Sequence, residues 1–533
     1  MESTPRNRAD AGLARPGDVL AGSDDAGALR GAPDLDTERL GRWIRARADL
    51  VAVAAITAVA AGIRFLALGV QGLDHDEAVT AVGVMQPTFG GMISAVVDLE
   101  RTPPLYYMLE WLWTRPLDFG TGVVDLRLLS AAFGTLTVPV AYLAARELSS
   151  RKAGVAAAAL VALNPFCVWY SQEARSYALL ILLVTLGLYL FARVLREPAH
   201  RRLWAWALVS VLALCTHYFA AFTVAPEAIW LLVAVKPRRR LLAPLAFVAA
   251  AGGALLPLAL AQQSSGDTDW FSATPILTRV WQIPVHYATS VKPEIPSSAG
   301  WITVVQISTA VAVAVLCGIA VAILVRRGLR TERRGAAIAA ALAAASFVIP
   351  VALAAAGADF VDARNLAGSL ALLLVAAAIA FGAMRAGRAG AVAGLGVCAS
   401  FAAVLALAAV TPQMQRPDWS VGESVLGRAR VKRIAVVPRP AGPPLAYYLG
   451  ASRAPADGRP VWTREIELYA TSPTTDPPER SFALASERAA RGGMWIARYI
   501  SPHPVRVWLS PDRITHMIGQ GASAIVTTPT RPG

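Results

Sequence analysis

The 533-residue chain contains little charge and almost no cysteine. Charged residues make up 16% of it and hydrophobic residues 55%, whereas roughly a quarter of the residues in soluble chains are charged. Its four cysteines, Cys167, Cys215, Cys317 and Cys398, all lie in apolar segments, so the sequence offers neither a disulfide framework nor a cysteine-based metal site in any loop. The shortage of charge indicates long apolar segments.

Several enzyme motifs are also missing. The sequence has no G-x-x-x-x-G-K-[ST] loop, no H-E-x-x-H pair, no G-x-S-x-G elbow and no strand-borne G-x-G-x-x-G, which removes the motif-based grounds for a P-loop, zinc-protease, hydrolase or dinucleotide-binding assignment. The net charge of +14 does not indicate nucleic acid, because the basic residues occupy short loops between apolar runs.

What the sequence does contain is a series of apolar runs of membrane-spanning length. Residues 301–325, for example, carry no charge, and about 20 apolar residues suffice for a span. We predict a polytopic α-helical membrane protein with about eleven transmembrane helices. The predicted spans are 50–70, 126–146, 153–169, 177–195, 203–218, 219–235, 241–262, 301–325, 335–356, 365–384 and 389–410.

The loops between these runs alternate in charge. One set is basic, as at 236–240 and 326–334, and the other is acidic, as at 74–77 and 98–100. The positive-inside rule then places the polar, disordered tail 1–45 in the cytoplasm and residues from 411 onward outside. We therefore expect a multi-pass protein of the plasma membrane.

Two segments outside the spans have their own predicted structure. Residues 104–117 are apolar but short, and counting them as a span would invert every later loop, so we expect an amphipathic helix on the outer surface within a large loop, 71–125. Residues 411–533 indicate a small extracytoplasmic α/β domain. Within it we expect strands at Arg433–Val437 and Ala522–Thr527 and a polar helix near Ser481–Arg491.

The densest polar cluster follows the first span, at Asp74-His75-Asp76-Glu77. Crowded carboxylates raise the pKa of one of them, which suits a general base. Asp74 and Asp76 could also hold a divalent metal such as Mg, Mn or Ca through oxygen ligands. A solvated loop is the structural alternative.

Other polar clusters fall on the same side of the membrane. The structural alternatives to a functional role for these clusters are membrane-interface anchors and internal ion pairs. Glu227 lies inside a predicted span and suits either a functional acid or a contact that pairs two helices. Acids, arginines and a histidine from several outer loops suit a site for an anionic, polar substrate at the bilayer surface. The clusters contain Arg101; Glu173, Arg175 and Tyr177; His217 and Tyr218; and Asp359, Asp362 and Arg364.

The order of these motifs resembles that of the GT-C membrane glycosyltransferases, in particular the group of protein O-mannosyltransferases and lipid A aminoarabinose transferases. The resemblance covers most of residues 60–410. Its marks are Asp76-Glu77, Pro103-Pro104-Leu105-Tyr106-Tyr107, Arg127-Leu128, Asn164-Pro165-Phe166, Tyr170 to Tyr177, His217-Tyr218, Arg364 and Pro417-Asp418-Trp419. The sequence departs from the family at Thr102, where His or Lys is common, and at Asn365, where Tyr is common.

The resemblance implies that residues 46–410 form the catalytic domain of an inverting, mannosyltransferase-like enzyme. The donor would be a polyprenyl-phosphate sugar, with mannose one candidate, and the acceptor a hydroxyl of an extracytoplasmic glycan, lipid or protein. It makes Asp76 the general base, with Glu77 beside it. The residues implied for the donor's phosphate and sugar are Arg101, Glu173, Arg175, Tyr177, His217, Tyr218 and Arg364.

Two other functional classes remain open from the sequence. One is a transporter or flippase of a lipid-linked glycan, although the acidic and histidine-bearing clusters all fall on one side. The other is a non-catalytic membrane scaffold that binds glycan through its tail. A transferase differs from both in needing Asp76.

Overall fold

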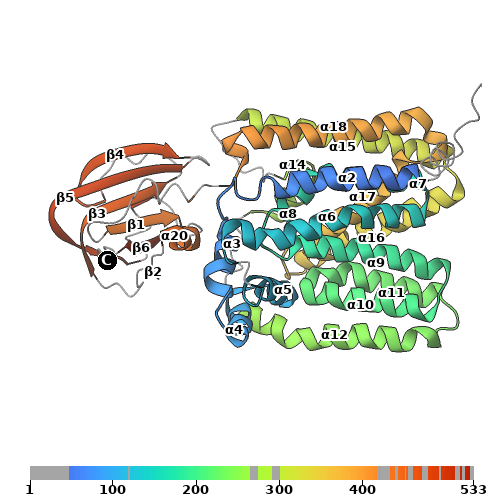
Figure 1. The fold of residues 1–533 in the computed structure, drawn as a ribbon, viewed down its shortest axis with the longest axis horizontal. Helices are drawn as coiled ribbons and strands as arrows, with labels where there is room; N and C mark the ends of the chain where they lie inside the picture. Colours follow the sequence, from blue (N-terminus) through green and yellow to red (C-terminus); the bar gives the residue numbers. More distant parts are fainter. Residues whose placement is uncertain are drawn as a thin grey trace, which may run out of the picture. The chain divides into compact units, whose positions relative to one another are not determined.

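The computed structural model consists mainly of long helices, with one small sheet near the C-terminus (Figure 1). It describes residues 47–117, 120–264, 274–290 and 300–416, and beyond these Trp419, 433–438, 442–449, 452–453, 460–470, 478–490, 494–510, 517–518 and 522–527. The predicted tail 1–45 and the pair Pro417-Asp418 lie outside the described residues.

Helices occur at all eleven predicted spans. Seven of the described helices are long and apolar enough to cross a membrane, or eight if one bent pair forms a single span. The predicted fold class is therefore confirmed, while eleven crossings stay a prediction. The helices at the spans are α2 (Ala48–Phe65), α6 (Val123–Leu148), α7 (Arg151–Leu163) with α8 (Pro165–Ser171), α9 (Tyr177–Arg196), α10 (His200–Thr216), α11 (Ala221–Ala234), α12 (Arg239–Ser264), α15 (Gly300–Arg327), α16 (Arg330–Ala355), α17 (Ala367–Phe381) and α18 (Gly387–Val410).

The bent pair is α7 and α8, which meet at 59°. Asn164 ends α7 and caps α8 through its side chain, and Pro165 opens α8, where its missing N–H costs nothing. The carbonyls of Val161 and Ala162 accept hydrogen bonds from the Arg64 guanidinium of α2, both at 3.0 Å. A buried arginine thus satisfies the backbone groups that the break leaves without helical partners.

Glycine allows the closest helix contacts of the bundle. A Cβ on Gly335 of α16 would lie 2.2 Å from the Leu148 carbonyl oxygen, and one on Gly382, just after α17, would lie 2.4 Å from the Ala153 nitrogen. Both neighbours are backbone atoms, so any side chain there would force the helices apart.

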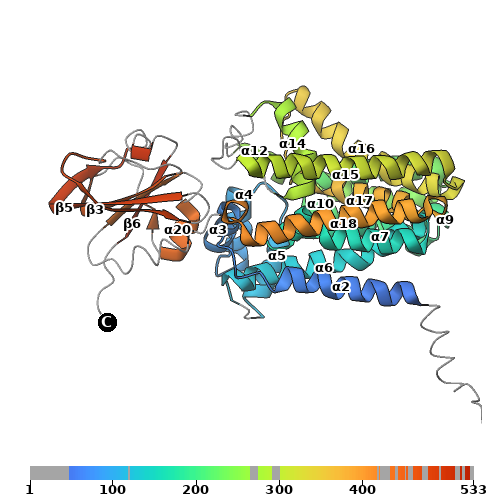
Figure 2. The same ribbon diagram turned by 90° about the horizontal axis from the view of Figure 1, so that it is seen from above.

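Short helices gather at one end of the bundle (Figures 1 and 2). They are α3 (His75–Val79), the π-helical turn η1 (Thr80–Val84), α4 (Phe89–Leu99) and α5 (Leu105–Thr114). The helix expected at 104–117 is therefore present as α5. It buries Tyr106, Tyr107 and Glu110, so its polar face packs inward instead of facing water.

A further helix, α14 (Ile276–Thr289), lies between the predicted spans 241–262 and 301–325 and was not predicted. The Asn164 amide donates to the Tyr287 carbonyl at 2.9 Å, and the Tyr287 hydroxyl donates to the carbonyl of Leu366 at 2.6 Å. α14 therefore joins the α7–α8 break to the start of α17.

The C-terminal domain is a six-stranded sheet of order β2-β6-β1-β3-β5-β4, with the helix α20 (Gly442–Leu449) beside β6 (Figure 2). The strands β1 (Arg433–Pro438) and β6 (Ala522–Thr527) confirm two predictions; β2 (Ser452–Arg453), β3 (Pro460–Ala470), β4 (Ala483–Ala490) and β5 (Met494–Trp508) complete the sheet. β1 and β3 are parallel and the other pairs antiparallel.

The polar helix expected near Ser481–Arg491 is wrong, because Ala483–Ala490 form the strand β4; Arg491 lies outside the described residues. β4 lies at the sheet edge, pairs only with β5, and is mostly exposed. An exposed edge strand needs no apolar alternation, so its sequence resembles that of a surface helix.

Candidate active site

The site begins where the chain turns from α2 into α3. Asp74 caps α3 by accepting the His75 N–H at 2.8 Å, and Glu77 reaches back to accept the Asp74 N–H at 3.1 Å. This capping box fixes the first turn of the helix. Asp76 lies inside that turn, so its position follows from the two capping residues.

Glu77 is the most constrained of these acids. Its side chain is fully buried and accepts hydrogen bonds from Arg127 Nε at 2.7 Å, from Arg127 Nη2 at 2.6 Å and from the Ala174 N–H at 3.0 Å. Burial alone would raise the pKa of this carboxyl, but Arg127 and Arg416 hold it below its usual range. Glu77 is therefore an ionised tie between α3, α6 and the segment before α9.

Asp76 differs from Glu77 in being open to solvent. Its side chain is 25% exposed, and its Oδ2 accepts a hydrogen bond from Arg364 Nη1 at 2.5 Å. Arg364 lies before α17, and its Nε is 3.8 Å from Asp362 Oδ1. Asp76 is thus the carboxylate of α3 that a substrate can reach.

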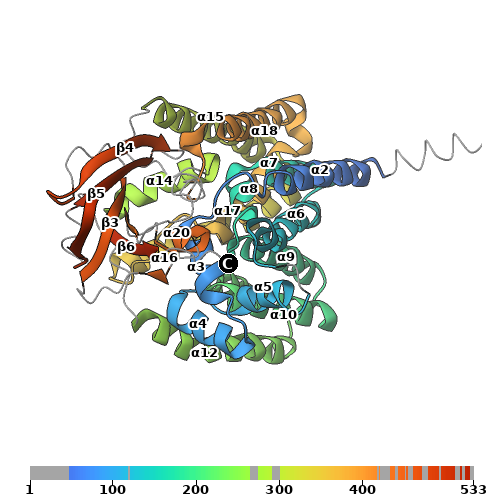
Figure 3. The same ribbon diagram turned by 60° about the vertical axis from the view of Figure 1, so that its left-hand side comes forward.

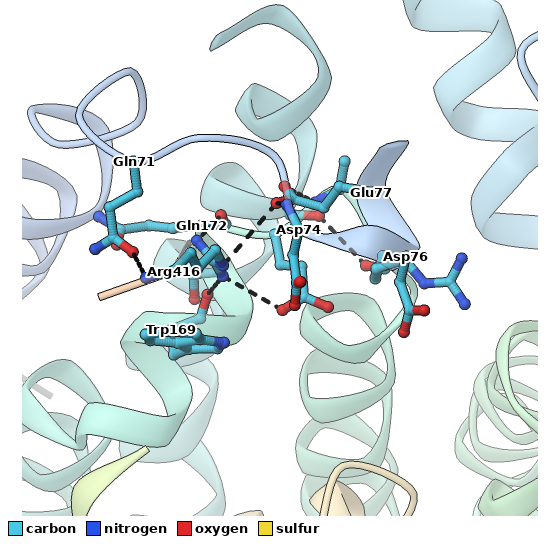
Figure 4. A network of polar contacts seen from close by, with 12 residues as sticks. Gln71, Asp74, Asp76, Glu77, Trp169, Gln172 and Arg416 are labelled. Carbon is cyan, nitrogen blue, oxygen red and sulfur yellow. Dashed lines mark hydrogen bonds and ion pairs between the residues drawn. The ribbon is translucent and has the colours of Figure 1, made fainter. Parts of the chain in front are cut away.

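A second buried acid, Glu173, pairs with an arginine that follows α18. Arg416 Nη2 lies 3.3 Å from Glu173 Oε2, and the guanidinium stacks on the Trp169 ring at 4.3 Å from its centre. Figure 4 shows Arg416 between Trp169 and the carboxylates of α3. Burial raises the pKa of the Glu173 carboxyl to about 7; Arg416 opposes this rise, and the nearby acids Glu77, Asp74 and Asp76 add to it.

Arg175 supplies a cation from the segment before α9. Its Nη1 donates to Glu100 Oε1 at 2.5 Å, and its guanidinium lies 5.7 Å from the centre of the Tyr107 ring. Its Nε has no hydrogen-bond partner among the described residues. A buried N–H without a partner is costly, so a ligand acceptor would stabilise it.

His217 presents a second such donor. Its Nδ1 accepts the Phe219 N–H at 3.2 Å, which leaves the ring proton on Nε2, and Nε2 is buried with no partner in the described part of the chain. Arg175 and Arg364 lie nearby, and a further positive charge on the buried ring would be unfavourable beside them. The imidazole is therefore a neutral hydrogen-bond donor near two arginines.

The structure brings most of the predicted site residues together. Tyr177 lies within electrostatic reach of Asp76, Arg364 and Arg175 and stacks near His217, with ring centres 5.8 Å apart. The residues that converge are Asp76, Glu77, Glu173, Arg175, Tyr177, His217 and Arg364.

Three predicted residues are placed otherwise. Arg101 is exposed, and its Nη1 donates to the neighbouring Glu100 carbonyl at 3.2 Å. The Tyr218 hydroxyl donates to Gln262 Oε1 at 2.8 Å. Asp74 serves as a helix cap. The geometry shows no site role for these side chains beyond these contacts.

The donor set does not fit the metal considered for Asp74 and Asp76. Asp74 caps α3, and Asp76 accepts a hydrogen bond from Arg364. Among the described residues no group of three or more His, Cys, Asp and Glu is placed to hold a metal ion. Divalent oxygen sites need several such ligands.

Sequence reasoning missed Arg127, Arg416 and Glu100 as parts of the site. Arg127 counted only as a motif at the start of a span, and Arg416 lies just beyond the last one. The available signal was the position of Arg127 and Arg416 at the edges of apolar runs, since charged side chains there usually pair with groups inside the helix bundle.

Residues 101–261 match the profile of the family described as dolichyl-phosphate-mannose-protein mannosyltransferase. This match confirms the resemblance to the GT-C glycosyltransferases. No curated protein matches the chain.

Three solved structures are among those similar to the chain. The Pmt1–Pmt2 protein O-mannosyltransferase complex of S. cerevisiae is 20% identical, with 41% of this chain and 34% of that chain covered and a TM-score of 0.34. The oligosaccharyltransferase AglB of Archaeoglobus fulgidus is 12% identical, with 68% of this chain and 56% of that chain covered and a TM-score of 0.43. ArnT of Cupriavidus metallidurans bound to undecaprenyl phosphate is 14% identical, with 84% of this chain and 97% of that chain covered and a TM-score of 0.49. The chain thus spans only about a third of the yeast protein and just over half of the archaeal one.

Proposed function

We propose that the protein is an inverting glycosyltransferase that moves a sugar from a polyprenyl phosphate to a hydroxyl on the extracytoplasmic side of the membrane. The observation that carries this proposal is a solvent-accessible carboxylate, Asp76, held beside Arg364 and two buried donors, Arg175 Nε and His217 Nε2, for which the described part of the chain supplies no hydrogen-bond partner. These groups are complementary to a base-assisted displacement in which a phosphate leaves.

Donor binding is the first step of the proposed reaction. The phosphate takes the Arg175 and His217 donors and competes with Asp76 for Arg364. Arginine suits this exchange because its fork binds carboxylate and phosphate alike. Once Arg364 turns to the phosphate, an oxygen of Asp76 becomes available for a proton.

Transfer then follows in one displacement. Asp76 accepts the proton of the acceptor hydroxyl as that oxygen bonds to the anomeric carbon, and the bond from that carbon to the phosphate oxygen breaks with inversion. The electron pair leaves on the polyprenyl phosphate, whose growing charge Arg364 and Arg175 stabilise. Glu77, with its hydrogen-bonded oxygens turned inward, positions α3 and takes no proton.

The activity test uses the full-length protein in nanodiscs and a panel of polyprenyl-phosphate sugars, mannose included, with release of polyprenyl phosphate as the readout. Loss of a general base costs about 10²–10⁴-fold, so Asp76→Asn should reduce turnover by at least about a hundredfold. Asp98→Asn, an exposed acid of α4, is the matched control and should keep full activity. Turnover that survives in Asp76→Asn would show that Asp76 is not the base.

A flippase is the alternative that the same preparation can test. In proteoliposomes, a flippase would move a fluorescent lipid-linked sugar across the bilayer. If this movement occurred while neither wild type nor Asp98→Asn released polyprenyl phosphate from any donor, the flippase would replace the transferase as the proposed function.

A further inference from the structure

Arg416 is the first charged residue after α18, and its side chain is only 2% exposed. Its Nη1 donates to the Gln172 carbonyl at 3.0 Å and its Nη2 to the Trp169 carbonyl at 3.2 Å. These are carbonyls at the C-terminal end of α8, where a cation is favoured by the helix dipole. The start of the C-terminal segment is thereby fixed to the helix that leads into Glu173.

The same side chain lies next to both buried acids of the site. Its Nη2 is 3.3 Å from Glu173 Oε2, and its Nε is 3.9 Å from Glu77 Oε2. Its backbone N–H donates to Gln71 Oε1 at 3.0 Å, and Gln71 lies in the turn before α3. Arg416 thus contacts the chain on both sides of Asp76: the turn before it and the glutamate after it (Figure 4).

The charges around this point balance closely. Glu77 and Glu173 are buried beside Arg127 and Arg416, and removing one member of a buried ion pair leaves an uncompensated charge. Arg416 opposes the rise of the Glu173 pKa that burial and the nearby acids cause. Without Arg416, Glu173 would therefore be protonated near pH 7, and the ion pair beside α3 would be lost.

We propose that Arg416 is a positioning residue for the transfer reaction: through its ion pair with Glu173 and its contacts around α3, it holds Asp76 in the orientation that accepts the proton. The effect of Arg416 on transfer rests on the proposed function, whereas its effect on the position of α3 rests on the geometry alone. It makes the first residues of the C-terminal segment part of the active-site support.

The ion pair exists only while Glu173 is ionised, which gives the proposal a pH signature. The pKa of Glu173, about 7, falls within the range of an activity assay. The charged and titratable groups around it are Asp74, Asp76 and Glu77 of α3 and its cap, Arg127 of α6, Tyr170 of α8, Tyr177 of α9 and Arg416. The wild-type kcat should therefore rise with pH through about 7 as the pair forms.

The kinetic test compares Arg416→Gln, Arg416→Lys and Glu173→Gln with wild type in nanodiscs. A displacement of about 1 Å at a reacting group costs about a hundredfold, so Arg416→Gln should lower kcat by about ten- to a hundredfold and leave the donor KM within about threefold. Arg416→Lys keeps the charge and should recover part of the loss. Both glutamine variants should lack the rise in kcat near pH 7, whereas a general loss of folding would lower kcat equally at every pH.

The control is Arg498→Gln, which removes an arginine from the sheet of the C-terminal domain, where it pairs with Glu465. It should leave kcat and the pH profile unchanged. Full turnover with an unaltered pH profile in Arg416→Gln would overturn the positioning role.

A readout that does not depend on turnover separates this inference from the proposed function. Losing a charge-assisted hydrogen bond costs about 1.5–3 kcal/mol, so amide exchange in residues 74–80 should quicken by about tenfold or more in Arg416→Gln and stay unchanged in Arg498→Gln. If wild type releases polyprenyl phosphate from no donor, the proposed function fails, while faster exchange in Arg416→Gln still shows that Arg416 holds α3 in place. If exchange there is unchanged, the inference fails whatever the activity of the protein.

Discussion

Two fully buried glutamates, Glu77 and Glu110, should respond in opposite ways to the same substitution. Both are 0% exposed, in short helices outside the predicted spans. Glu77 accepts two hydrogen bonds from Arg127. Glu110 lies against the Tyr106 hydroxyl, and no arginine or lysine of the described chain forms an ion pair with it.

For Glu77→Gln the cost comes from the arginine left behind. The pKa of Glu77 is held below its usual range, so the carboxylate is ionised at pH 7 and its contribution to stability is lost only as the pH falls through that lowered pKa. An amide cannot balance the charge of Arg127, which is 1% exposed. Breaking a buried pair costs about 3–5 kcal/mol, and this cost should be constant from about pH 5 upward.

For Glu110→Gln the sign is reversed. Burial raises the pKa of Glu110 well above its usual value of 4.5, so between that usual value and the raised pKa the folded protein holds a proton that the unfolded chain has lost. Stability therefore falls as the pH rises above about 4.5, by about 1.4 kcal/mol per pH unit until the raised pKa is passed. Glutamine removes this penalty, so the variant should equal wild type near pH 5 and exceed it at pH 7.

The assay is thermal unfolding in detergent, followed with a thiol-reactive dye that reports exposure of the four cysteines in the apolar helices. One kcal/mol corresponds to about 2–4 °C in domains of 150–250 residues and to less in a larger chain. Glu77→Gln should lower the midpoint by several degrees, and Glu110→Gln should hold or raise it. Equal losses in the two variants would refute the reasoning, because burial alone would then decide the cost.

Other expectations follow from single contacts. His217→Ala should weaken donor binding by about ten- to a hundredfold, the value of a hydrogen bond to a charged group, and His217→Gln should restore most of it because its amide also donates; an equal loss in both would count against the Nε2 assignment. Gly335→Ala should destabilise the protein, since its Cβ would meet the Leu148 carbonyl. Gly253→Ala in α12 should stabilise it by about 0.5–1 kcal/mol, because a Cβ there meets nothing within 4 Å. The reverse order of stabilities in thermal unfolding would contradict this packing. A cysteine at position 75 should react with an impermeant maleimide on intact cells, and labelling only after lysis would place α3 on the cytoplasmic side.

The spans could be read from the sequence because apolar runs of helical length have few other uses, and the structure has a helix at each. α14 escaped because it buries only part of one face, at Ile283 and Val285 to Thr289, and Pro284 and Gln282 interrupt the apolar pattern. α5 was located correctly but given the wrong environment, since a buried acid such as Glu110 has no signature in sequence.

The site was partly predictable for a related reason. Asp76, Arg175 and Arg364 stand in predicted outer loops, and His217 lies at the end of the predicted span 203–218. The predicted sidedness alone therefore gathers them at one surface. Which acid is reachable and which is tied down depends on partners far along the chain, 50 residues away for Arg127 and 243 for the contact of Arg416 with Glu173. No local pattern encodes such pairings.

The bond between Arg64 and the α7–α8 break has a consequence for how the chain assembles. Arg64 and the carbonyls of Val161 and Ala162 are about 97 and 98 residues apart, which is about 5–20 s of synthesis at 5–20 residues per second. Throughout that interval the guanidinium must stay hydrated at the membrane surface, because lipid offers it no partner. α2 leaves the ribosome well before the α7–α8 break is synthesised, so we expect it to reach its final depth only after that break has formed.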